Sequence, residues 1–130
     1  MKYLVLLGRI CFSAIFMLTI MSHFKYETIV YAQSQGVPLA EFLVPLSCII
    51  AFTGGLSILL GYKAKIGAAL IIIFLIPVTF YMHAFWKVAE PMQQHMQMVN
   101  FMKNLSLLGA ALLISYFGSG PCSIDNKGIK

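Results

Sequence analysis

Residues 76–114 read IPVTFYMHAFWKVAEPMQQHMQMVNFMKNLSLLGAALLI, which is two apolar runs joined by a short polar stretch. In the first run, Thr79, His83 and Trp86 follow the spacing i, i+4, i+7. Residues at this spacing lie on one face of a helix. The pattern predicts a helix whose end carries a hydroxyl, an imidazole and an indole on the same side.

The second apolar run contains Asn100, Lys103 and Asn104, which also share one helical face by the i, i+3, i+4 rule. Two neighbouring helices joined by a short turn can bring two such faces together at one depth. The sequence therefore predicts a polar patch between the two arms of this hairpin.

The composition indicates an integral membrane protein. The chain of 130 residues is 60% hydrophobic and only 10% charged, and its mean hydropathy is +0.88. Soluble domains average about 45–50% apolar and about 25% charged residues. Because a spanning helix needs about 20 residues, the length allows four spans in a single domain, residues 1–130, with no separate soluble domain.

Four stretches have the length and composition of spanning segments: about residues 3–21, 42–61, 66–86 and 99–117. Lipid cannot satisfy open backbone groups, so each span must be an α-helix. The expected fold class is all-α, a four-transmembrane-helix bundle. Pro91 suits the first turn of a helix, so we expect the fourth helix to start near Pro91 and to project beyond the membrane.

The first span resembles a secretory signal peptide at its start, but its end differs. It is followed by His23, Phe24 and Lys25 instead of a small-residue cleavage site. We therefore expect the first span to be retained.

A short interfacial helix is predicted between the first and second spans, within residues 24–35. Its apolar side chains fall on one face and its polar side chains on the other, as in helices that lie at a membrane surface. Gly36 and Pro38 end it, because Gly accepts the left-handed cap and Pro cannot continue a helix. A plain surface loop is the alternative.

The positions of Lys and Arg predict the orientation. With four spans, one side of the membrane holds Lys2, Arg9, Lys63, Lys65, Lys127 and Lys130. The other side holds Lys25, Lys87 and Lys103. The excess on the first side favours cytoplasmic N- and C-termini by the positive-inside rule. The net charge of +5 is then a topology signal, and we expect no nucleic-acid partner.

Small residues follow a regular spacing in the second span. Ser47, Ala51 and Gly55 are four residues apart, and Gly54 stands beside Gly55. In lipid such residues let helix backbones approach closely. They predict a helix-packing face, either within the chain or between the copies of a homo-oligomer.

Several motifs of the chain are similar to the DoxX family of small bacterial membrane proteins. The hairpin carries His83-Ala84-Phe85-Trp86 and Asn100-Phe101-Met102-Lys103-Asn104-Leu105. Elsewhere the similar motifs are Gly8-Arg9, Gly36-Val37-Pro38, Gly54-Gly55, Leu60-Gly61 and Gly118-Ser119-Gly120-Pro121. One departure is Ala51, which stands where the family often has a Glu.

The DoxX resemblance implies a four-helix membrane bundle and a link to redox membranes. Members of that family are associated with quinol oxidase or thiosulfate–quinone oxidoreductase complexes and with assemblies that deal with oxidative stress. They usually act as subunits beside a partner protein that carries the redox centre. The resemblance thus implies an accessory subunit, a redox partner protein, and a quinone or a membrane lipid as ligand.

The expected ligand site is an outer-side polar cluster at the mouth of an apolar cavity, formed by Glu41, His83, Trp86, Lys103 and Asn104. Lys103 and Asn104 would donate hydrogen bonds to a ligand, and His83 would accept a proton. The alternatives are that Lys103 snorkels to the interface or pairs with Glu41. His83 and Trp86 also fit an interfacial belt.

Arg9 lies inside the first span and is expected to anchor that helix. It either snorkels to lipid phosphates or bonds backbone carbonyls and Asp125 in the C-terminal tail. No metal site is expected, because Cys11, Cys48 and Cys122 form no C-x-x-C pair.

Three function classes follow from the sequence. The first is a membrane subunit of a redox complex that binds a quinone or a lipid. The second is an independent enzyme or transporter, which the absence of Asp and Glu inside the spans disfavours. The third is a structural scaffold or oligomer-forming protein with no ligand chemistry of its own.

Overall fold

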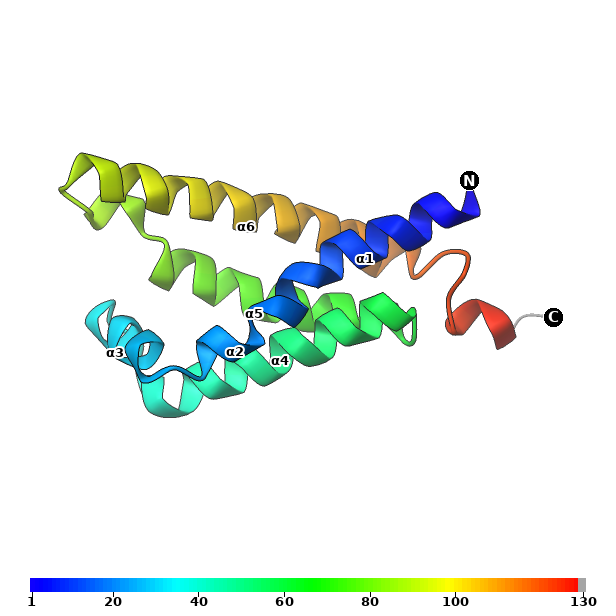
Figure 1. Ribbon diagram of the computed structural model, residues 1–130, viewed down its shortest axis with the longest axis horizontal. Coiled ribbons are helices and arrows are strands. Elements are labelled where there is room, and N and C mark those ends of the chain that lie inside the picture. Colours follow the sequence, from blue (N-terminus) through cyan, green and yellow to red (C-terminus); the bar gives the residue numbers. More distant parts are fainter. Residues whose placement is uncertain (129–130) are drawn as a thin grey trace.

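The computed structural model describes residues 1–128 of the chain, and Lys130, which was counted for the orientation, lies outside them. The regular elements of this part are all helical (Figure 1). In chain order they are α1 (Lys2–Leu18), α2 (Ile20–His23), α3 (Tyr26–Ser34), α4 (Ala40–Leu60), α5 (Ala64–Met82), η1 (Phe85–Lys87), α6 (Pro91–Phe117) and η2 (Asp125–Gly128). The expected all-α class is confirmed.

Four segments are long and apolar enough to cross a membrane. They are Lys2–Ser22, Ala40–Leu60, Ala64–Lys87 and Pro91–Phe117. The four expected spanning helices are therefore present.

The first spanning segment is broken near its end. α1 stops at Leu18 and α2 starts at Ile20. Between them, the Thr19 hydroxyl donates a hydrogen bond of 2.7 Å to the Ile15 carbonyl. A Thr side chain that bonds back to the preceding turn competes with the helical ladder and bends the helix. The single helix expected over residues 3–21 is thus two helices.

α3 occupies the predicted place between the first two spans, and its end is defined by a Schellman motif. The Val37 amide donates to the Ala32 carbonyl at 3.1 Å, and the Gly36 amide donates to the Gln33 carbonyl at 3.0 Å. Gly36 has the left-handed φ of +83° that this motif requires. Pro38 follows at once, so the chain leaves α3 in a fixed direction and enters α4.

The long helices pack in the order α1, α4, α5, α6, because α1 contacts α4, α4 contacts α5 and α5 contacts α6. Figure 1 shows α6, α5 and α4 one beside the next, with α1 crossing diagonally in front of them. The largest buried cluster includes Phe12 and Phe16 of α1, Ile71 and Phe74 of α5, and Ala111 of α6. The core therefore draws on helices from both ends of the chain.

The backbones of α4 and α5 come very close at Gly54 and Gly67. A Cβ atom on Gly54 would lie 2.8 Å from the Gly67 carbonyl oxygen, and one on Gly67 would lie 2.6 Å from the Ser57 hydroxyl. Both distances are too short for a real Cβ contact. Glycine at these positions is what allows the two helices to touch.

The small residues expected to form a packing face have separate surroundings. Gly54 faces α5, whereas a Cβ atom on Gly55 would lie 2.9 Å from the Cβ atom of Phe16 in α1. Ala51 is buried in the main core, and Ser47 is half-buried. Three of the four therefore pack inside the chain.

Gly54→Ala should destabilise the fold by about 1–3 kcal/mol, because the added methyl group would force α4 and α5 apart. Unfolding in mixed micelles with increasing denaturing detergent, followed by circular dichroism, measures the change. Gly109→Ala is the matched control, since a Cβ atom on Gly109 has no neighbour within 4 Å. Equal stability of the two variants would contradict close α4–α5 packing.

Candidate functional site

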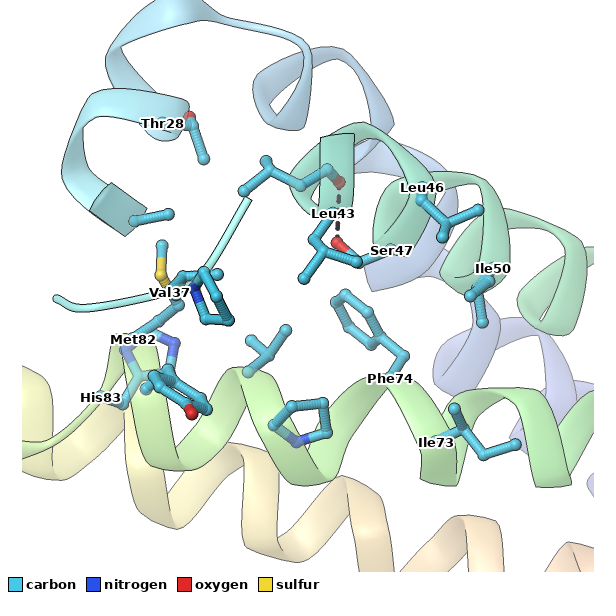
Figure 2. A pocket seen from close by; sticks show the side chains of 16 residues that line it. Thr28, Val37, Leu43, Leu46, Ser47, Ile50, Ile73, Phe74, Met82 and His83 are labelled. Carbon is cyan, nitrogen blue, oxygen red and sulfur yellow. Dashed lines mark hydrogen bonds between the residues drawn. The ribbon is translucent and has the colours of Figure 1, made fainter. Parts of the chain in front are cut away.

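An apolar groove with a volume of about 460 Å³ lies between α3, α4 and α5 (Figure 2). Its lining consists of Thr28, Ala32, Val37, Pro38, Leu43, Val44, Leu46, Ser47, Ile50, Ile73, Phe74, Pro77, Val78, Tyr81, Met82 and His83. Most of these side chains are aliphatic or aromatic. The volume falls within the range of about 300–1,000 Å³ that is usual for ligand pockets.

α3 and the turn after it form the roof of the groove. Ala32 of α3 is fully buried and packs with Ala40 and Val44 of α4. Val37 and Met82 pack against the same small cluster. This second core fixes α3 over the ends of α4 and α5, and the Schellman turn directs Val37 and Pro38 into the lining.

Two of the polar groups in the lining are already committed to backbone carbonyls. The Thr28 hydroxyl donates to the Ser22 carbonyl at 2.9 Å, and the Ser47 hydroxyl donates to the Val44 carbonyl at 2.7 Å. The other polar lining groups are the Tyr81 phenol and the His83 imidazole. Polar contacts to a ligand would therefore come mainly from the end of α5.

A chain of hydrogen bonds, here called the polar relay, consists of Tyr31, Gln97 and His83. The Tyr31 hydroxyl donates to the Met82 carbonyl at 3.1 Å. Gln97 Nε2 donates to the Tyr31 oxygen at 3.2 Å, and Gln97 Oε1 lies 2.8 Å from His83 Nδ1. The relay ties the roof helix α3 to α5 and α6 at the end of the groove.

Partial burial raises the pKa of the Tyr31 phenol above its ordinary value. The hydroxyl therefore keeps its proton at neutral pH and remains able to donate to Met82.

The structure places only one of the five predicted cluster residues in the groove lining, and that residue is His83. Exposed Glu41 accepts a hydrogen bond from Gln33 at 3.5 Å. Lys103 is also exposed, and its Nζ donates to Asn100 Oδ1 at 3.2 Å. The expected set is thus not assembled at one cavity mouth.

Trp86 and Asn104 have different surroundings from those expected. Trp86 is 52% exposed and makes ring contacts with Phe80, Phe85 and Phe101. Asn104 is buried on α6 with 6% of its surface exposed. The roles of all five predicted cluster residues in ligand binding stay predictions.

Sequence reasoning missed Tyr31 and Gln97. Gln97 lies three residues before Asn100 on α6 and seven before Asn104, so it extends their shared face by one turn. Counting that extra turn would have identified Gln97. Nothing in the sequence pairs Tyr31 with residues that lie 51 and 66 positions later.

Arg9 is buried at the opposite end of the bundle, with only 4% of its surface exposed. Its Nη2 donates a hydrogen bond to the Cys122 carbonyl. A backbone carbonyl, which was one of the two alternatives for this side chain, is therefore the contact found. Arg9 Nε and Nη1 and the Ser13 hydroxyl are buried without a hydrogen-bond partner among the described residues.

The tail segment, residues 118–125, folds back over the turn between α4 and α5. The Asp125 amide donates to the Gly61 carbonyl at 2.8 Å. The Asp125 carboxylate in turn accepts hydrogen bonds from the amides of Lys63 at 2.8 Å and Ala64 at 3.3 Å. It thereby caps the start of α5 from a distant part of the chain.

The pKa of the Asp125 carboxyl is lowered, first by the hydrogen bond from the Lys63 amide. The Ala64 amide, the Ser119 hydroxyl and the positive charge of Arg9 lower it further. Asp125 therefore stabilises the docked tail in its ionised form.

A sequence model of the SURF4 family matches residues 1–130, which is the whole chain. The chain belongs to the SURF4 family. Together with the four long apolar helices, this makes it a multi-pass membrane protein of that family.

Three relatives of this SURF4-family protein are informative. It is 36% identical over 95 residues to the inner membrane protein YqjF of Escherichia coli (strain K12). The aligned residues are 73% of this chain and 67% of YqjF. It is 28% identical over 100 residues to the inner membrane protein YphA of the same organism, covering 77% of this chain and 71% of YphA.

The third relative is the Surfeit locus protein 4 homolog of Schizosaccharomyces pombe. The identity is 27% over 105 residues, which is 80% of this chain but 34% of the yeast protein. The SURF4-family chain thus spans about a third of the length of this relative. No solved structure matches the chain.

The expected membership of the DoxX family is wrong, because the family model that matches the full chain is that of the SURF4 family. The motifs that suggested DoxX are mostly glycine turns and helix-end residues. Such features recur in small bundles of apolar helices for packing reasons. The redox association was implied only by the DoxX resemblance, so it has no support once that family assignment is corrected.

In this SURF4-family protein, Asp125→Asn should loosen the tail by about 0.3–1 kcal/mol, because it keeps a capping oxygen but removes the negative charge at the start of α5. The pKa of Asp125 is lowered in the folded state, so its stabilisation is present above the unfolded value of 3.8 and is lost as the pH falls below it. Hydrogen exchange of residues 118–125 and of the Lys63 amide measures the effect. Wild type and variant should converge in acid, and a difference that persists there would contradict the assignment.

Proposed function

We propose that this SURF4-family protein binds a lipid-type hydrophobe in the apolar groove between α3, α4 and α5. The observation that carries the proposal is a roofed groove of about 460 Å³ in the surface of a membrane bundle. Ordinary lipid-facing surface is open on the bilayer side. Here α3 and the turn after it cover the end of the groove next to His83, so a bound chain would contact both the bundle and α3 at that end.

The lining favours an acyl chain over a charged or strongly polar ligand. Two of its four polar side chains already donate to backbone carbonyls. The remaining polar groups stand at the end of α5. This arrangement fits an amphiphile whose chain fills the groove and whose polar end lies near His83.

The redox subunit hypothesis is not carried forward, because it depended on the DoxX resemblance. A scaffold function has no observation of its own in its favour. Ala51, Gly54 and Gly55, which would have formed an oligomer interface, pack inside the chain. A scaffold is the function that remains if the groove binds nothing.

Ile73→Trp should abolish retention of the bound hydrophobe, because the indole would occupy space in the groove. Leu113→Trp on α6 is the matched control. Ile73 and Leu113 are both apolar and are 60% and 61% exposed, but only Ile73 lines the groove. Native mass spectrometry of the purified proteins, followed by lipid extraction, measures the bound molecule.

The proposal expects wild type and the Leu113 variant to retain one defined hydrophobe, and the Ile73 variant to lose it while keeping its helical circular dichroism. Retention by all three proteins would show that the molecule binds elsewhere. If wild type retains no specific hydrophobe, the proposed hydrophobe binding is wrong and the scaffold function remains.

We also propose that the N- and C-termini are cytoplasmic, in a bacterial inner membrane. Arg9, Gly61 and Cys122 lie together at one end of the bundle, and the described Lys and Arg residues of that end outnumber those of the other. By the positive-inside rule, this excess supports a cytoplasmic location for this end. The two inner membrane proteins of Escherichia coli among the relatives support the choice of membrane.

Thiol labelling tests this orientation at Cys122, which is an exposed free cysteine. In a variant with Cys11→Ser and Cys48→Ala, a membrane-impermeant maleimide should label Cys122 in inverted membrane vesicles but not in intact spheroplasts. Labelling only in spheroplasts would reverse the proposed orientation.

A further inference from the structure

The geometry of the polar relay fixes the direction of each of its hydrogen bonds. A backbone carbonyl can only accept, so the single proton of the Tyr31 hydroxyl goes to Met82. The Tyr31 oxygen must then accept from Gln97, which orients the amide with Nε2 towards Tyr31. A flipped amide would place two acceptors against each other.

The same logic determines the tautomer of His83. With Nε2 of Gln97 turned to Tyr31, the amide oxygen Oε1 faces His83 Nδ1 at 2.8 Å. An amide oxygen has no proton to give, so Nδ1 must carry the hydrogen. In the neutral imidazole, Nε2 is then a hydrogen-bond acceptor with a free lone pair.

This acceptor belongs to a residue at the end of the apolar groove, next to Val37 and Met82 in Figure 2. Within the described residues, the His83 side chain forms no hydrogen bond besides the one to Gln97. The relay thus holds a half-buried imidazole in one tautomer and leaves its second nitrogen available.

This inference rests on the proposed function. We infer that the groove selects acyl lipids whose polar end carries a hydroxyl group, and that this hydroxyl donates a hydrogen bond to His83 Nε2. A ligand whose polar end consists only of acceptors, such as an ester or a quinone carbonyl, would face the lone pair of Nε2. Placing two unpaired acceptors together in an apolar site carries the desolvation cost without a compensating bond.

A matched pair of lipids tests the inference. 1,2-Dioleoylglycerol presents a free hydroxyl, and its 3-O-methyl ether has the same chains without the donor. Competition between them for the detergent-purified protein is measured by native mass spectrometry at about pH 8, where an ordinary imidazole is neutral. We expect wild type to prefer the alcohol by roughly two- to tenfold, the usual effect of one hydrogen bond.

Variants locate the preference within the groove. His83→Phe should bring the ratio of the two affinities to about one, since one hydrogen bond is removed. Gln97→Leu should reduce the ratio, because it frees the imidazole to adopt the other tautomer. Tyr116→Phe is the control, because it removes an exposed phenol of α6 that does not line the groove, and it should leave the ratio unchanged. A merely structural change would weaken both lipids together and would not alter the ratio.

The outcomes separate this inference from the function on which it rests. If neither lipid binds wild type, the proposed hydrophobe binding fails. If both bind equally well, the groove function stands and the donor selectivity is wrong. A preference that persists in the His83→Phe variant would assign the selectivity to another polar group of the lining, such as the Tyr81 phenol, and would overturn the inference.

Discussion

In lipid, two apolar helices gain little by covering each other's side chains, so close packing of backbone and small residues has to hold them together. The approach of α4 to α5 at Gly54 and Gly67 supplies this packing. It sets the spacing of the two helices that form the floor of the groove. It also sets the turn at Gly61, on which the tail segment docks. The groove and the docked tail therefore both depend on this one contact, which lies near the turn between α4 and α5.

Much of the architecture could be predicted from composition and periodicity. The number of spans and the helix between the first two follow from hydropathy, from segment length and from Gly36 with Pro38. The break at Thr19 could not be predicted, because a Thr hydroxyl bonds back to its own helix in some contexts and not in others. Local sequence carries no information on that choice. It depends on how the chain continues into α3.

The candidate site was predicted less well, for a physical reason. Helical spacing shows which residues share a face of one helix, but not the rotation of that helix against its neighbours. His83, which was predicted at the mouth of a cavity, lines the groove, whereas Lys103 faces outwards and bonds to Asn100 on its own helix. Tyr31 reaches the site from α3 through tertiary packing alone. The family assignment failed in a similar way, since glycine turns are shared by unrelated bundles of apolar helices.

The bond between Arg9 and the tail also has a consequence for biosynthesis. Cys122 follows Arg9 by 113 positions, so a ribosome completes nearly the whole bundle before the carbonyl that receives this guanidinium exists. Until then, α1 must keep its cation at water or lipid phosphate, near the membrane surface. Docking of the tail allows α1 to settle to its final depth against α4. Residues that are translated after all four spanning helices thus complete the placement of α1.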